Sequence, residues 1–172
     1  KKDVAIGDES KLGVDYDTRF FEELSWYAKA DLENDRLEDV DLRATSALGL
    51  KYSWIEATNY KTSVRAGAAF RFEELGSDAV ENLSEPALDF GLEHSQKIKN
   101  FLGFESDLSF VPHIDDFSDY LFSKDTALVI AIDEKQDWKI RSGLAGTYNS
   151  TPVPGKEEMD IKYYLRVVYD FD

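Results

Sequence analysis

The residues of this sequence that could perform chemistry are few, and one group lies in an acidic segment. His113 precedes Asp115 and Asp116, which gives the pattern H-x-D-D. Carboxylates are hard oxygen ligands, so this segment could hold a divalent cation. The spacing matches no established set of metal ligands, and we therefore interpret the segment as a solvated loop without a metal.

A serine and a histidine form the second group. Ser106 and His94 fall on the same face of neighbouring predicted strands, an arrangement that could support a serine nucleophile beside a histidine base. An acid that would orient the histidine is not evident. The sequence also carries no P-loop, dinucleotide fingerprint or zinc motif. We interpret His94 as an interfacial residue, and predict a protein that is not an enzyme and holds no cofactor.

The bulk composition excludes several classes of function. The formal net charge is −15, which does not suit nucleic acid because phosphate binding needs clustered Lys and Arg. The chain has no cysteine, which excludes disulfides, thiolate metal sites and a cysteine nucleophile. Its 172 residues suit a single domain over residues 1–172. It starts at Lys1 without Met or a signal-like region, so we expect the natural N-terminus to lie upstream.

The elements that carry these residues are predicted to be β-strands, because their side chains alternate in character with a period of two. Near the end of the chain, Ile161, Tyr163 and Leu165 alternate with Lys162 and Arg166. The same alternation recurs over residues 24–32, 42–54, 64–72, 88–93, 102–110 and 140–148. No run approaches the ~20 consecutive apolar residues of a membrane helix.

The strands and their connections indicate an up-and-down order. We count nine clear strands of ~10 to 14 residues, against a usual length of about 5 to 6. A short first strand in DVAI, joined through GDES to KLGVDYD, would make ten. Short turns alternate with long acidic loops, in which we place all four prolines. The predicted fold is all-β, an antiparallel up-and-down β-barrel of about ten strands, within a range of about 8 to 12.

The face that points inward decides between a soluble barrel and a membrane barrel. A soluble barrel is apolar inside, whereas an outer-membrane barrel is apolar toward lipid. The charged face here also carries the mid-strand glycines, which would make room for long side chains in a narrow lumen. The apolar face is almost free of charge, and its aromatic residues gather near strand ends, as in interfacial girdles. We therefore predict a transmembrane barrel, apolar outside and lined inside by charged and small residues.

Two sets of residues follow from this interpretation. The predicted lumen-lining residues are Lys29, Arg43, Lys51, Arg65, Arg71, Asp89, Glu93, Glu105, Asp107, Lys139, Arg141, Lys162 and Arg166. The predicted aromatics at the lipid interfaces are Trp26, Tyr52, Trp54, Tyr120, Trp138, Tyr148, Tyr163, Tyr169 and Phe171. We expect Lys162 and Arg166 to pair with Asp or Glu on adjacent strands, because an unpaired buried charge is costly. Lys124 is the one clear charge on the apolar face, near a loop.

Three segments resemble the DUF481 family, also called salt-induced outer membrane proteins. They are YDTRFFEELSWYAKADLENDRLEDVDLRATSALGLKY, DDFSDYLFSKDTAL and TPVPGKEEMDIKYYLRVVYDF, and the likeness runs over about residues 12–171. Its motifs are an aromatic pair before a strand, D-x-D-L-R, G-x-x-Y and P-x-P-G. Family members usually carry further N-terminal strands with a Gly-Asn-rich signature, which is not found here. Asp172 after Phe171 also departs from the usual final aromatic, the signal that the outer-membrane assembly machinery reads.

The resemblance implies an outer-membrane β-barrel of a Gram-negative bacterium and supplies no catalytic residues. Our first functional prediction is a monomer with a plugged, charge-lined lumen and an envelope or salt-stress role. Its expected partners are the lipid bilayer, the assembly machinery and, through the acidic loops and bridging cations, lipopolysaccharide. Two alternatives stay open: a narrow channel for ions or small polar solutes, and a soluble up-and-down barrel that binds lipid inside.

Overall fold

The computed structural model describes residues 9–35, 40–75, 83–133, 138–152 and 157–169. These residues form one nine-stranded antiparallel sheet in which each strand pairs with the next along the chain. The strands are β1 (Glu9–Arg19), β2 (Leu24–Asp35), β3 (Val40–Ala57), β4 (Tyr60–Leu75), β5 (Leu83–Lys99), β6 (Leu102–Pro112), β7 (Tyr120–Ala131), β8 (Trp138–Asn149) and β9 (Met159–Tyr169). The predicted all-β, up-and-down order is confirmed. In the described part of the chain, no helix is long and apolar enough to cross a membrane.

Six of the nine described strands have 11 or 12 residues, within the predicted range, whereas β3, β4 and β5 are longer, with 18, 16 and 17 residues. Strand β3 continues to Ala57 past the end of its clear alternation. The cause is the tight turn at Thr58 and Asn59, which lets backbone pairing run on to Ala57 and Tyr60. Hydrogen bonding in a two-residue hairpin thus extends the strands beyond the amphipathic pattern.

Two predictions about connections were wrong in part. GDES was expected to be a turn, but Glu9 and Ser10 already belong to β1, where they pair with Asp35 and Asn34. The strand predicted in DVAI lies outside the described residues. Pro86 and Pro112 lie in β5 and β6 instead of in loops.

Pro86 is tolerated inside β5 because of its place in the ladder. It lies opposite Phe70 of β4, whereas the pairing of β5 with β6 begins only at Phe90. Proline lacks an amide hydrogen and fits where one side of a strand has no full ladder. Its carbonyl accepts a 3.2 Å hydrogen bond from the amide of Ile114.

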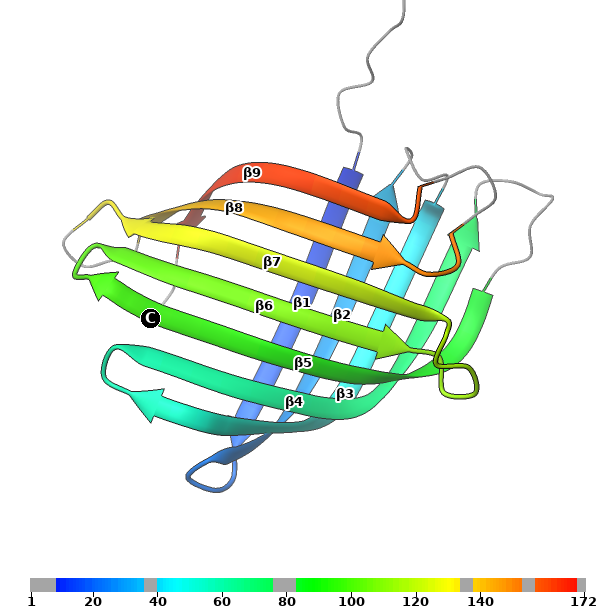
Figure 1. Cartoon of the computed structure of the whole chain (residues 1–172), viewed down its shortest axis with the longest axis horizontal. Coiled ribbons are helices and arrows are strands. Elements are labelled where there is room, and N and C mark those ends of the chain that lie inside the picture. Colours follow the sequence, from blue (N-terminus) through cyan, green and yellow to red (C-terminus); the bar gives the residue numbers. More distant parts are fainter. Residues whose placement is uncertain (1–8, 36–39, 76–82, 134–137, 153–156, 170–172) are drawn as a thin grey trace, which may run out of the picture.

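The sheet curls into a half-barrel, with β5 to β9 crossing in front of β1 to β3 in Figure 1. Strands β1 and β9 form its two edges, and among the described residues they do not pair with each other. Eight successive antiparallel pairings make β1 and β9 run in the same direction. The described sheet thus has an odd number of strands, one fewer than the ten of the sequence prediction.

The two faces of the sheet have inverted character. The concave face carries the charged and small side chains, among which Asp89 is 0% and Arg71 1% exposed. The convex face carries the large apolar ones, with Trp54 63% and Tyr163 86% exposed. Apart from Tyr27 and Val111, the buried hydrophobic residues in the described part of the chain are alanines. A soluble protein buries its large apolar residues, and this sheet exposes them.

Candidate functional site: an ion network on the concave face

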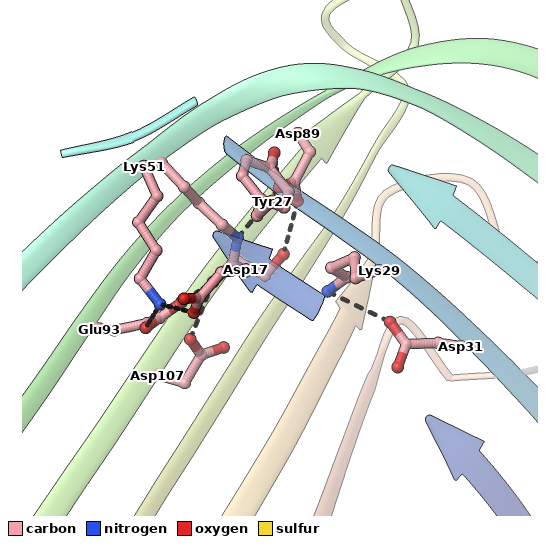
Figure 2. A network of polar contacts seen from close by, with 10 residues as sticks. Asp17, Tyr27, Lys29, Asp31, Lys51, Asp89, Glu93 and Asp107 are labelled. Atoms are coloured by element: carbon pink, nitrogen blue, oxygen red, sulfur yellow. Dashed lines mark hydrogen bonds and ion pairs between the residues drawn. The ribbon is translucent and has the colours of Figure 1, made fainter. Parts of the chain in front are cut away.

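A fully buried carboxylate, that of Asp89 in β5, lies at the centre of the concave face. It accepts hydrogen bonds from Tyr27 Oη at 2.6 Å, from Arg65 Nε at 3.0 Å and from Ser109 Oγ at 3.4 Å. Tyr27, Asp89 and their neighbours are seen together in Figure 2. Three donors from three different strands thus replace the water that this carboxylate lost on burial.

Arg65 in β4 connects Asp89 to two further carboxylates. Its Nη1 donates to Glu93 at 3.0 Å and to Asp107 at 3.1 Å. Glu93 and Asp107 lie directly opposite each other in β5 and β6, where like charges repel unless a cation lies between them. The guanidinium supplies that cation with a planar set of donors. Its Nη2 is buried and has no hydrogen-bond partner among the described residues.

Lys51 in β3 extends the network toward β1. Its Nζ lies 2.5 Å from Glu93 and 3.4 Å from Asp17, as Figure 2 shows. Lys29 forms a separate 3.2 Å pair with Asp31 on its own strand. The network therefore joins strands β1 to β6 through side chains, in addition to their backbone ladders.

Glycines make this arrangement possible. Tyr27, Gly49, Gly67 and Asp89 occupy one row across β2, β3, β4 and β5. A Cβ on Gly67 would lie 2.6 Å from Tyr27 Oη, so the phenol crosses two strands over bare backbone. A Cβ on Gly91 would overlap the Arg65 guanidinium, which lies flat on that glycine. The expected role of concave-face glycines, making room for long side chains, thus holds at these positions.

A second network repeats the device across β7, β8 and β9. Tyr164 lies over Gly143 and donates a 2.5 Å hydrogen bond to Asp125. Arg141 donates to Tyr164 Oη at 3.1 Å and to Asp125 at 3.0 Å, and it pairs with Glu105 at 3.3 Å. Each network thus combines a tyrosine, an arginine and an aspartate above glycine.

A third group lies at the end of the sheet where the long loops are. Arg71, which is almost fully buried, pairs with Asp119 at 3.4 Å, and Thr151 Oγ1 donates to the same carboxylate at 2.8 Å. His113 Nε2 lies 3.9 Å from Glu85. These contacts fasten the segment between β6 and β7 to β4 and β5.

The acidic segment of His113 does not gather into a metal site. Asp116 accepts hydrogen bonds from the hydroxyl of Ser118 at 2.6 Å and from its amide at 2.9 Å. These bonds hold the pKa of Asp116 below its usual value. Among the residues that the structure describes, no three His, Cys, Asp or Glu side chains converge as metal ligands.

His94 and Ser106 lie directly opposite each other in β5 and β6, but the structure describes no hydrogen bond between them. Instead, His94 Nδ1 is 2.8 Å from the hydroxyl of Thr62, and Ser106 Oγ is 3.2 Å from that of Thr126. Each side chain is bonded toward a different neighbouring strand. This geometry is not that of a nucleophile held by its base.

The strand alternation places the predicted lumen residues on the concave side. One network contains Lys51, Arg65, Asp89, Glu93 and Asp107, and the other contains Glu105 and Arg141. Arg43 is buried in β3. Lys162 was expected to pair with an acid on an adjacent strand, and the pair that the structure describes is with Asp160 of its own strand, at 2.7 Å.

The pairing predicted for Arg166 was wrong. In the described part of the chain it has no carboxylate partner, and its guanidinium lies 4.3 Å from the centre of the Tyr164 ring. The residue opposite Arg166 in β8 is another cation, Arg141. Since β9 is an edge of the described sheet, no second neighbouring strand is there to offer an acid.

The predicted interface aromatics lie on the convex side wherever their side chains are described. Trp26, Tyr52, Trp54, Trp138 and Tyr163 are exposed. Tyr120 and Tyr148 are half-buried because their rings stack at 5.7 Å. Phe171 and the side chain of Tyr169 lie outside the described residues.

Sequence reasoning missed Tyr27 and Tyr164 as members of the networks. Neither was named among the predicted lumen-lining residues, although both alternate in phase with charged residues. Such a residue could be found as a tyrosine on the charged face that lies opposite a glycine of the neighbouring strand. The phenol ring can then lie flat over the glycine and place its hydroxyl beside an acid further along the row.

The arrangement neutralises charge and fills space on the concave face, and a cavity of about 510 Å³ lies beside it. Comparison with known proteins gives one result that bears on this geometry. The sequence model of the family described as "Protein of unknown function, DUF481" matches residues 2–171, which confirms the family resemblance. No curated protein matches the chain.

Proposed function

This chain belongs to the DUF481 family, and on that premise we propose that it is an outer-membrane β-barrel protein whose lumen is plugged by ion pairs. The observation that carries the proposal is the inverted burial. Asp89 and Arg71 are buried, whereas Leu165 on the convex face is 72% exposed. An envelope role under osmotic or salt stress, with no enzymatic activity, follows as the proposed physiology.

The length of the strands supports a membrane span. The shortest strands have 11 residues. At ~3.3 Å per residue they reach ~36 Å, which a tilt of ~40° reduces to a height of ~28 Å. The apolar band of an outer-membrane barrel is about 25 Å tall. A soluble sheet has no need of strands this long.

The aromatic residues of the convex face support the same proposal. Phe90, Phe110, Phe122 and Tyr148 form one row across β5, β6, β7 and β8 toward the long loops. Trp26, Tyr52, Trp54 and Trp138 lie toward the short turns. Aromatic residues gathered toward both ends of the strands are typical of the girdles of a membrane barrel.

The edges of the sheet need a further strand in this proposal. Unpaired backbone amides and carbonyls cost several kcal/mol each in lipid, so β1 and β9 cannot stay open there. Because β1 and β9 run in the same direction, one additional strand antiparallel to both would close an antiparallel barrel. We infer a closed barrel of ten strands, or of another even number.

Tryptophan quenching by brominated lipid tests the membrane proposal. Trp26, Trp54 and Trp138 are all exposed on the convex face. In vesicles of brominated phosphatidylcholine we expect strong quenching of their fluorescence. Unquenched fluorescence, with the protein left in the aqueous phase, would refute the membrane proposal and return the soluble lipid-binding barrel to consideration.

A narrow channel is the second candidate, and the cavity of about 510 Å³ on the concave face favours it. Lys29, Lys51, Arg65 and Arg141 line this cavity together with carboxylates, which suits ions or small polar solutes. Single-channel recording separates the two candidates. A silent bilayer supports the plugged barrel, and discrete conductance steps support the channel.

A further inference from the structure

A second, open pocket lies at the short-turn end of the concave face. It has a volume of about 300 Å³ and is formed by the β3–β4 turn, the β5–β6 turn and the adjoining ends of β7 and β8. Lys61, Lys97, Lys99 and Lys139 line it. The pocket thus gathers four cations at one place in a chain whose net charge is −15.

Three of these lysines differ from the paired cations at the centre of the concave face. The carboxylate among the pocket's described lining residues, that of Glu105, already pairs with Arg141 at 3.3 Å. No carboxylate of the described residues lies within ion-pairing distance of Lys61, Lys97 or Lys99.

The cations near the centre of the concave face are paired, unlike Arg166 on the edge strand β9, which stacks on Tyr164. Lys29, Lys51, Arg65 and Arg141 each have a carboxylate within 3.4 Å. Solvated lysines beside tight turns are ordinary on protein surfaces. Solvation alone does not explain why three such lysines line one pocket, next to a network in which the cations are paired.

The remaining lining residues supply neutral hydrogen-bond donors. Asn59, Gln96 and Asn100 contribute amides, and Thr58 and Ser95 contribute hydroxyls. The Lys99 ammonium is 6.0 Å from the centre of the Phe101 ring, which lines the same pocket. Ammonium groups together with amide and hydroxyl donors are the chemistry that recognises phosphate or carboxylate oxygens.

We propose that this pocket binds a small soluble polyanion that carries phosphate or carboxylate groups. Its lysines Lys61 and Lys139 alternate in phase with Arg65 and Arg141 of the concave face, and not with the convex apolar residues, which favours a free solute over a lipid headgroup. The pocket shares Lys61, Ser95 and Glu105 with the larger cavity, so a solute held there lies at the entrance to the ion network. The site does not depend on membrane insertion, and its test is separate from that of the proposed function.

Calorimetric titration with inorganic pyrophosphate tests the proposal on the full chain refolded in a zwitterionic detergent. The unaltered chain should bind saturably. A triple variant, Lys61→Gln with Lys97→Gln and Lys99→Gln, should bind at least about tenfold more weakly, because it removes three charge-assisted contacts to the anion. Lys124→Gln is the matched control, since Lys124 is exposed outside the pocket, and its affinity should stay within about twofold.

Three outcomes overturn the proposal: no saturable binding by the unaltered chain, equal binding by the triple variant, or an equal loss with Lys124→Gln. A Lys61→Arg, Lys97→Arg, Lys99→Arg variant keeps the charge and should retain binding, which separates loss of charge from loss of fold. The source of the anion is tested in nanodiscs with and without phosphatidylglycerol. Unchanged pyrophosphate affinity supports a free solute, and competition of about tenfold would overturn it in favour of a headgroup.

Discussion

The phenol of Tyr27 donates a 2.6 Å hydrogen bond to Asp89 although two strands lie between them. The bond is possible because Gly49 and Gly67 fill the intervening positions of the row. The two residues are 62 positions apart in the chain. The contact therefore connects the N-terminal part of the sheet to its centre through side chains.

Removing the Tyr27 hydroxyl should destabilise the fold. Tyr27→Phe leaves the buried Asp89 carboxylate with two donors in place of three, and we expect a loss of about 1–3 kcal/mol in the free energy of unfolding. Urea titration in lipid vesicles, followed by tryptophan fluorescence, measures it. Tyr163→Phe is the matched control, because Tyr163 is 86% exposed on the convex face. Equal stability of the two variants would contradict the role assigned to Tyr27.

The glycines of the concave face should differ sharply in their tolerance of a methyl group. A Cβ on Gly67 would lie 2.6 Å from Tyr27 Oη and 2.8 Å from Gly49 Cα. Gly67→Ala should therefore cost about 1–3 kcal/mol or more and reduce the refolding yield. At Gly103 the nearest atom is 3.5 Å away, so Gly103→Ala should refold as the unaltered chain does. The shift of folded protein on unheated gels reports both yields, and a similar loss in both variants would refute the account.

The two aspartates that bind Arg65 should contribute unequally. Asp89 is fully buried, whereas the side chain of Asp107 is 42% exposed. Asp89→Asn removes the charge that balances a buried guanidinium and should cost about 3–5 kcal/mol, whereas Asp107→Asn should cost about 1 kcal/mol or less. Urea midpoints of the two variants give the comparison. The reverse order would mean that Arg65 is neutralised chiefly through Asp107.

Cysteine cross-linking tests whether β1 and β9 meet directly. The chain has no native cysteine, so engineered pairs are unambiguous. With one strand inserted, convex residues of β1 and β9 would lie about 10 Å apart, beyond the ~7 Å limit for a disulfide. We expect no cross-link when Val14→Cys is combined with Tyr163→Cys, Leu165→Cys or Val167→Cys.

The control for that experiment is Val14→Cys with Ala30→Cys. These residues lie directly opposite each other in β1 and β2, so a disulfide should form under mild oxidation. An efficient cross-link between β1 and β9 would instead establish a nine-stranded closure with one parallel pair.

Much of the fold could be predicted because alternation is a local signal. In β9, the apolar character of Ile161 and the charge of Lys162 indicate the face on which each lies, and no other strand is needed to predict it. The strand ends were less predictable, because the reach of β3 to Ala57 depends on its hairpin turn and not on side-chain character. Pro86 was misplaced because its strand extends past its neighbour, and this length mismatch is visible only when all registers are known.

The composition of the site could be predicted, but its connections could not. The period-two alternation of side chains placed Arg65 and Asp89 on the same face of the sheet. That Arg65 also reaches Asp107, and that Tyr27 reaches Asp89, depends on the curl of the sheet. The failed prediction for Arg166 has the same cause. Its neighbour in β8 is Arg141, and the sequence of one strand does not reveal which residue lies opposite in the next.

The hydrogen bond between Tyr27 and Asp89, which spans the row that also contains Gly49 and Gly67, depends on the curvature of the sheet. Three inter-strand steps measure ~14 Å along a flat sheet, more than a tyrosine and an aspartate side chain together can bridge. The bond therefore forms only where the sheet is bent strongly enough to bring Tyr27 and Asp89 closer than their separation along the sheet. The path of three inter-strand steps and the direct distance between the two residues together fix the radius of the bend. These four residues therefore constrain the curvature of this part of the sheet, and with it the diameter of the barrel that the strands would form.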